Sequence, residues 1–126
     1  MKKILIVQAD YYKDVSLSLL KSAKNSLNNY SIKIIKVPGV FEIPVTISKN
    51  INKHDAFIAL GCVIKGETPH FDYISSATTQ SIMKLSVDNR KPIGNGIITC
   101  LNKKQAKARG KKGKEAAQAV ISILSQ

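Results

Sequence analysis

The sequence predicts an α/β sandwich in which a parallel sheet of about four strands carries helices on both faces. Short runs rich in β-branched apolar residues recur along the chain, and the first of them, Ile4–Val7, is continuous, as is typical of strands buried on both sides. Each run is separated from the next by a segment long enough for a crossover helix. The 126 residues, 44% of them hydrophobic, are enough for one core, so we expect a single domain over residues 1–126.

Four apolar runs are the predicted strands: Ile4–Val7, Ile32–Val37, Ala56–Gly61 and Ile93–Thr99. Between the first two, apolar residues repeat near helical spacing from Val15 to Leu27 and predict the first helix. A second helix is expected over Phe41–Ile51, with Pro44 in its first turn, where a missing amide donor costs little.

The third helix is expected over Asp72–Val87, with the Asp72 side chain capping its free amides. The chain then continues with a helical segment over Lys103–Arg109. Gly110 and Gly113 interrupt this segment, and an amphipathic helix follows over Lys114–Leu124.

The formal net charge of +12 raises the question of nucleic acid, because Lys and Arg gain affinity by displacing counterions from phosphates. Half of this excess lies in residues 102–126, which contain no aromatic side chain. A solvated lysine-rich helix face is the commoner explanation of such a run, and the charge can also steer anionic substrates. We therefore expect no specific nucleic-acid partner.

No apolar stretch approaches the ~18 residues that a membrane span needs, so we expect no membrane partner. The apolar run Ile4–Val7 after Lys2 and Lys3 is too short for a signal peptide, so we expect a cytoplasmic protein. Cys62 and Cys100 each stand near the end of an apolar run and are interpreted as buried free thiols. A metal site is not expected, because His54 and His70 lie in unrelated settings without ligand spacing.

Ligands of parallel sheets bind beyond the carboxyl ends of the strands, so the segments after each strand are the candidate site. After the first strand, either Tyr11 or Tyr12 can stack on a planar ligand, or merely cover the helix start. After the second, the amides of Val40 and Phe41 begin a helix and can bind oxygens. Glu42 can accept hydroxyl donors, or simply suit the helix dipole.

The segment after the third strand is the most informative. Gly66, the Thr68 hydroxyl and the amides of the following helix suit a phosphate cradle, and His70 can exchange a proton. A lone loop histidine is more often structural, but its neighbours favour a functional role. After the fourth strand, Arg109 and Lys112 can clamp a phosphate, or serve only as surface charges.

Four motifs together resemble the lumazine synthase family of riboflavin biosynthesis, over nearly the whole chain. They are Val37-Pro-Gly-Val-Phe-Glu-Ile-Pro, Leu60-Gly-Cys-Val-Ile-Lys-Gly-Glu-Thr-Pro-His-Phe-Asp-Tyr, Pro92-Ile-Gly-Asn-Gly-Ile-Ile-Thr and Lys112-Gly-Lys-Glu-Ala-Ala. The resemblance implies a flavodoxin-like three-layer sandwich without metal or organic cofactor. It also implies condensation of 5-amino-6-(D-ribitylamino)uracil with 3,4-dihydroxy-2-butanone 4-phosphate. The products are 6,7-dimethyl-8-ribityllumazine, phosphate and water, in the penultimate step of the pathway.

Site roles follow from the resemblance by motif position. His70 is the histidine that assists the proton transfers. The implied phosphate-binding residues are Gly66, Glu67, Thr68, Arg109 and Lys112. The residues implied to hold the pyrimidine and its ribityl chain are Tyr11, Val40, Phe41, Glu42, Val63, Ile64 and Asn95. The family forms homopentamers whose sites are shared between subunits, so Asn95 is expected to come from the neighbouring subunit, and riboflavin synthase is a candidate partner.

Three features depart from the family pattern. Met1 stands almost directly before the first strand, which leaves no room for the extra N-terminal strand that many relatives pair with a neighbouring subunit and disfavours assembly beyond a pentamer. The link between Arg109 and Lys112 is shorter than usual, which can alter how both meet phosphate. Asn95 stands where many relatives carry an aromatic residue, which makes that wall more polar. These departures keep one rival open, a flavodoxin-like module that binds a flavin, lumazine or nucleotide without turnover.

Overall fold

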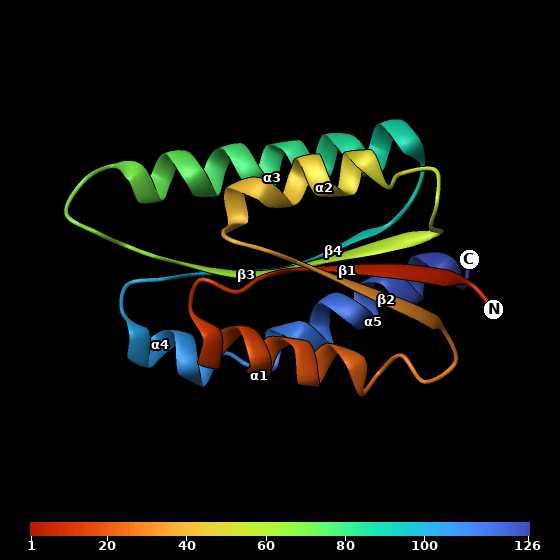
Figure 1. Cartoon of the computed structure of the whole chain (residues 1–126), viewed down its shortest axis with the longest axis horizontal. Coiled ribbons are helices and arrows are strands. Elements are labelled where there is room, and N and C mark those ends of the chain that lie inside the picture. The colour runs from red at the N-terminus through yellow and green to blue at the C-terminus, as the bar shows by residue number, and fades with distance from the viewer.

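The computed structural model describes residues 1–126 as a three-layer α/β sandwich (Figure 1). One sheet contains four strands: β1 (Lys3–Ala9), β2 (Ser31–Val37), β3 (Ala56–Ile64) and β4 (Ile93–Cys100). Their order is β2-β1-β3-β4, and every neighbouring pair is parallel. The predicted fold class is therefore confirmed.

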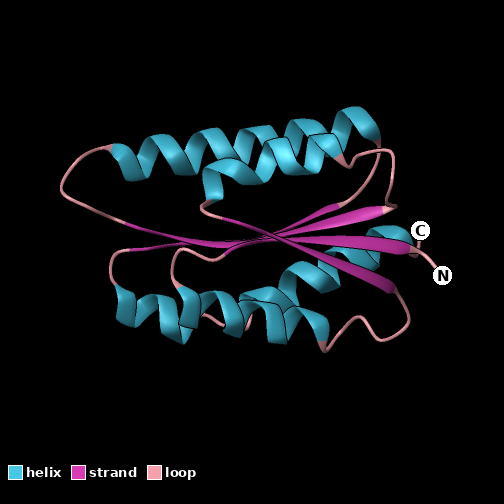
Figure 2. Cartoon of the chain, viewed as in Figure 1, coloured by secondary structure: helices cyan, strands magenta, loops and turns pink.

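The helices form separate layers on the two faces of the sheet (Figure 2). One layer contains α1 (Lys13–Lys24), α4 (Lys103–Ala108) and α5 (Lys112–Leu124). The other contains the 3₁₀ turn η1 (Val40–Glu42), α2 (Ile43–Lys49) and α3 (His70–Asn89). None of these helices is both long and apolar enough to span a membrane.

Two hydrophobic cores lie on opposite faces of the central strands. Ile4 and Ile6 of β1 pack in the core that contains Leu19 of α1, whereas Leu5 and Val7 pack in the core under α2. All of these β1 side chains are fully buried. A strand covered on both faces has no solvent side for polar residues, which explains the unbroken apolar runs of β1 and β3. The expectation of burial on both sides is wrong for β2 and β4, which are the edge strands and expose Lys33, Lys36 and Asn95.

The third strand and third helix extend beyond their predicted bounds. Cys62–Ile64, expected in a loop, continue β3 because they pair in register with Ile98–Cys100 of β4. The prediction that Asp72 caps α3 is wrong, because the helix begins at His70 and places Asp72 inside its first turn. Pro69 occupies the cap position without a side-chain hydrogen bond, and the Thr68 hydroxyl accepts the His70 amide at 3.4 Å.

The other helix boundaries differ by a few residues. The first helix ends at Lys24 rather than continuing to Leu27, although Leu27 remains buried in the first core. The predicted helix over Phe41–Ile51 divides into η1 and α2, with Pro44 in the first turn of α2 as expected. Helix α5 begins at Lys112 rather than at Lys114, so Gly113 belongs to its first turn.

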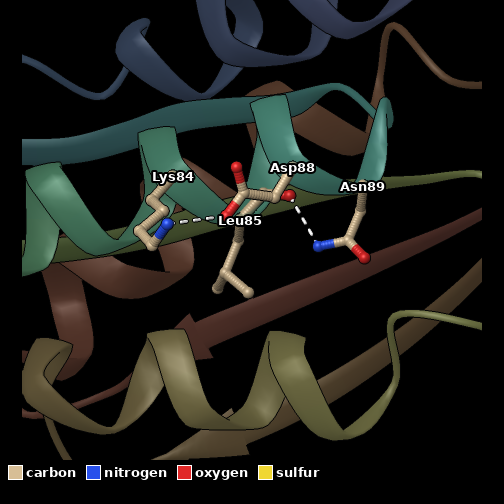
Figure 3. A network of polar contacts seen from close by, with 4 residues as sticks. All are labelled: Lys84, Leu85, Asp88 and Asn89. Carbon is tan, nitrogen blue, oxygen red and sulfur yellow. Dashed lines mark hydrogen bonds and ion pairs between the residues drawn. The ribbon is translucent and has the colours of Figure 1, made fainter.

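The far end of α3 is stabilised by contacts within the helix (Figure 3). Lys84 Nζ pairs with Asp88 Oδ2 at 2.9 Å, and Asn89 Nδ2 donates to the Leu85 carbonyl at 2.8 Å. Arg90 then ends the helix in a left-handed conformation with φ of 54°. This end leads directly into β4, so it lies at the amino edge of the sheet, away from the predicted site.

Gly94 of β4 is required because α5 lies directly against the sheet. A Cβ at Gly94 would collide with the carbonyl oxygen of Ala116, which belongs to the α5 backbone. We expect Gly94→Ala to lower the free energy of unfolding by about 1–3 kcal/mol, measured by urea denaturation. Gly66→Ala is the matched control, since a Cβ there meets nothing within 4 Å, and an equal loss in both variants would contradict this explanation.

Candidate active site

The carboxyl ends of β1, β2 and β3 open onto a cavity of about 330 Å³. In the sheet, β2 and β3 lie on opposite sides of β1. The cavity therefore lies at the point where the strand order reverses. The lining residues come from four separate segments: Ala9, Tyr11, Tyr12, Gly39, Val40, Phe41, Cys62, Val63, Ile64, His70 and Ile74. Most of them are apolar, as in many small-molecule sites.

The two tyrosines after β1 have different environments. The Tyr11 side chain is 73% exposed, whereas Tyr12 packs against the core beneath α1. Their rings meet edge to face, with centroids 4.9 Å apart. Burial raises the pKa of the Tyr12 hydroxyl, as expected for a packed phenol. Tyr11 is therefore the tyrosine that is accessible for stacking on a ligand.

The segment after β2 turns sharply over the end of the sheet. Val40 is buried and Phe41 is 62% exposed, so neighbouring residues contribute to the core and to the cavity wall. A Cβ at Gly61 of β3 would lie 2.5 Å from Val40 Cγ1, so this glycine lets the turn close on the sheet. Glu42 does not line the cavity, and its Oε1 lies 3.3 Å from where a Cβ at Gly39 would stand.

The end of β3 and the start of α3 form the opposite wall. Val63 and Ile64 lie in the last two strand positions, and His70 is the first residue of α3. His70 is exposed and lines the cavity together with Ile74, one helical turn later. The Lys65 amide donates to the Cys100 carbonyl at 2.9 Å, which keeps β3 and β4 paired to their ends.

The predicted phosphate residues lie beside the cavity rather than in its wall. Gly66, Glu67 and Thr68 are exposed on the loop between β3 and α3. Arg109 follows α4, and its Nη1 donates to the Thr99 carbonyl at 3.1 Å, so the guanidinium lies at the carboxyl end of β4. The loop and the guanidinium thus share one edge of the sheet without a hydrogen bond between them.

Lys112 follows this arginine by three residues. It is the first residue of α5, is half-buried, and its amide donates to the Arg109 carbonyl at 3.0 Å. A cation at a helix N-terminus is unfavourable for the helix dipole unless an anion is bound nearby. The positions of Lys112 and Arg109 are therefore compatible with an anion, although neither lines the cavity.

Asn95 is separated from the cavity of its own chain. It lies in β4, an edge strand, and pairs in register with Ala59. The carboxyl end of β4, at Cys100, lies five positions further along the chain, which is roughly 16 Å along a strand. Its Oδ1 accepts the Ile97 amide at 3.0 Å, and its side chain is exposed.

The structure therefore brings together six of the predicted residues as cavity lining: Tyr11, Val40, Phe41, Val63, Ile64 and His70. The sequence interpretation missed four others: Ala9, Gly39, Cys62 and Ile74. Helical spacing from His70 could have identified Ile74, and the apolar run that continues past Gly61 could have identified Cys62. Nowhere do three or more His, Cys, Asp or Glu side chains gather closely enough to hold a metal ion.

Cys62 is a neutral thiol in the cavity wall. Both cysteines are free, but only Cys100 is fully buried, so the expectation of two buried thiols is wrong for Cys62. Burial, together with the adjacent Cys100, raises the pKa of the Cys62 thiol to about 12. It is therefore a poor nucleophile near neutral pH and contributes mainly apolar surface.

Comparison with known proteins gives a consistent result over the whole chain. A sequence model described as 6,7-dimethyl-8-ribityllumazine synthase matches residues 1–126. A protein of that name from Agrobacterium fabrum is 39% identical over 135 residues, covering 96% of this chain and 91% of its own length. One from Bartonella tribocorum is 40% identical over 132 residues, covering 97% and 87%. One from Cutibacterium acnes is 39% identical over 133 residues, covering 98% and 80%.

The raised pKa of the Cys62 thiol predicts slow alkylation of this residue in the folded protein. At pH 8 we expect iodoacetamide to modify Cys62 roughly 10³-fold more slowly in the folded protein than in urea, because the neutral thiol is not the nucleophile. The rate should rise as the pH approaches the pKa. Peptide mass spectrometry after timed quenching measures this rate, and rapid modification of folded Cys62 at pH 8 would show that the thiol is ionised.

Proposed function

Because the chain belongs to the 6,7-dimethyl-8-ribityllumazine synthase family, we propose that it is a transferase that forms 6,7-dimethyl-8-ribityllumazine in riboflavin biosynthesis. Its proposed substrates are 5-amino-6-(D-ribitylamino)uracil and 3,4-dihydroxy-2-butanone 4-phosphate, and its proposed place is the penultimate step. The observation that supports this most strongly is the cavity at the strand-order reversal, which gathers predicted residues from four segments of the chain.

The proposed pyrimidine end is the apolar cavity. The exposed Tyr11 ring stacks on the flat heterocycle, while Val63 and Ile64 cover it from the end of β3. The ribityl chain lies along Val40 and Phe41, where backbone amides at the start of η1 and the nearby Glu42 carboxylate meet its hydroxyl groups. Apolar walls with a few polar groups suit such a ligand.

The proposed phosphate end lies between the loop after β3 and the start of α5. Arg109 binds the phosphate with its planar guanidinium, supported by the Thr68 hydroxyl, the Gly66 and Glu67 backbone and the Lys112 ammonium. The exposed, unobstructed backbone at Gly66 permits close approach of the phosphate oxygens. This division gives each substrate its own end of the site.

His70 is the proposed proton-transfer group. It begins α3, between the apolar cavity and the loop that holds Thr68. The pyrimidine amine attacks the ketone to form an imine with loss of one water. The phosphate then leaves, and tautomerisation produces a carbonyl at the neighbouring carbon. The ribitylamino nitrogen attacks this carbonyl and a second water is lost, which closes the lumazine ring. Alignment of the two reactants can supply roughly 7–11 kcal/mol, so His70 assists a reaction that depends mainly on positioning.

We propose a homopentamer in which each site is shared between neighbouring subunits. The distance of Asn95 from its own cavity supports this, since an exposed residue on an edge strand is accessible to a neighbour. Asn95 then gives that wall a polar amide. Residues 1–126 act as one unit in the cytoplasm, which suits two free cysteines, and riboflavin synthase is the proposed consumer of the product.

The first test is product formation. We expect the intact protein to form lumazine, followed by absorbance and fluorescence, faster than the uncatalysed reaction. Arg109→Ala should lose most of this rate through a raised KM for the butanone phosphate, because it lacks the guanidinium. Arg90→Asn is the arginine control, since Arg90 lies at the amino edge of the sheet and Asn tolerates its positive φ. Tight binding of lumazine or flavin without any product would instead support the binding module.

The second test concerns His70. We expect His70→Ala to slow turnover by up to ~10²–10⁴-fold without abolishing it, because positioning of the substrates remains. His54→Gln is the histidine control, since His54 packs against Phe57 at the amino end of β3. Unchanged turnover in His70→Ala, measured by single-turnover fluorescence, would remove the proposed role.

A further inference from the structure

The link between α4 and α5 lies directly on α1. A Cβ at Gly110 would collide with the Ser18 hydroxyl oxygen, and one at Gly113 would collide with the Leu19 carbonyl oxygen. The two glycines therefore let the backbone of the link approach the helix without intervening side chains. The same link carries Arg109 and Lys112, the two cations of the proposed phosphate end.

The Ser22 hydroxyl joins α1 to both sides of this link. It donates to the Gly110 carbonyl at 2.6 Å, one residue after Arg109. It also accepts the Lys114 amide at 3.1 Å, two residues after Lys112. One half-buried hydroxyl thus holds the backbone within two residues of each of the two cations.

The contact with Lys114 replaces a missing helix cap. The first amides of a helix have no partner within the helix, and α5 has no side-chain cap at its own Lys111. The Ser22 hydroxyl takes this role from a different helix, 92 residues away in the sequence. The orientation of the α5 N-terminus therefore depends on α1.

Arg109 is held from two directions. Its side chain is anchored by the hydrogen bond from Nη1 to the Thr99 carbonyl at the end of β4. Its backbone is anchored through Gly110 and Ser22 to α1. Two-point recognition of phosphate by a guanidinium depends on its orientation, so a small displacement of the link weakens binding.

We propose that Ser22 is a positioning residue for the phosphate-bearing substrate, acting through the Arg109–Lys112 link. This inference rests on the proposed phosphate role of Arg109. Ser22 does not line the cavity and its hydrogen bonds are all to backbone atoms, so it acts on the phosphate end through the geometry of the link. The two hydrogen bonds of Ser22 explain how the short link between Arg109 and Lys112 is held in place.

The test compares Ser22→Ala with Ser18→Ala. Ser18 lies one turn earlier on α1, faces the same link and makes no side-chain hydrogen bond, so it controls for removing a hydroxyl from this surface. We expect Ser22→Ala to raise the KM for the butanone phosphate, and the dissociation constant of inorganic phosphate measured by calorimetry, by about 3–10-fold. The KM for the pyrimidine should stay within about twofold, as should all constants of Ser18→Ala.

A purely structural role for Ser22 gives a different result. Its loss would then lower the melting temperature but leave phosphate affinity and both KM values of the folded protein unchanged, which would overturn the proposal. If Ser22→Ala does not fold, Ser22→Cys supplies the test, because a thiol is a weaker donor of similar shape. Phosphate affinity between that of the wild type and that of Arg109→Ala supports the proposal, and wild-type affinity overturns it.

The failure of this inference is distinguishable from that of the proposed function. If the wild type forms product and only Arg109→Ala loses phosphate affinity, the enzyme stands and the role of Ser22 is wrong. If the wild type forms no product while Arg109→Ala and Ser22→Ala both lose phosphate affinity, the reaction is wrong and the positioning role stands. If Arg109→Ala binds phosphate normally, the positioning role falls with the phosphate site.

Discussion

Burial of β1 and β3 on both faces is the constraint on which the rest of the structure depends. Ile4–Val7 and Ala56–Leu60 are fully buried, so these strands present no polar side chain to solvent along most of their length. The polar residue Gln8, near the end of β1, is itself buried, and its Nε2 donates to the buried Ser16 hydroxyl at 2.6 Å, which ties the end of β1 to the first turn of α1. Tyr11 and Tyr12 are held between these two anchors. Polar chemistry is thereby confined to the segments that follow the strands.

The same constraint made the fold and the place of the site predictable from the sequence. An apolar run without alternation is interpretable only as a strand covered on both faces or as a buried helix segment, and the short runs here favoured strands. Parallel strands then place Tyr11, Val40 and His70 at one edge, although 59 positions separate the first of them from the last. The boundaries were less predictable, because Cys62–Ile64 pair with β4 through backbone hydrogen bonds that no residue type specifies.

Sequence patterns could not predict contacts between segments that lie far apart in the chain. Nothing local to Ser22 indicates that its hydroxyl meets Gly110 and Lys114, because the contact exists only after α1 and α5 have packed. The need for glycine at position 94 in β4 was equally unpredictable. Its backbone conformation does not require glycine, but a Cβ there would collide with the carbonyl oxygen of Ala116 in α5. Asp72 shows that a local pattern can also mislead. Its side chain is suited to cap a helix, but Thr68 and Pro69 precede an earlier helix start, so Asp72 lies inside the first turn of α3.

Under the proposed function, the two ends of the site use different physical forces and so sort the two substrates. The cavity wall offers mainly apolar contact and the exposed Tyr11 ring, which favour a flat heterocycle over a phosphate. The opposite end offers Arg109 and the lysine-rich start of α5, which favour a phosphate over an uncharged ring. Neither substrate gains by exchanging ends, because a phosphate in the apolar cavity would lose its hydration without gaining a cation. The orientation of the reactants about His70 then follows from burial and charge alone, before any specific hydrogen bond forms.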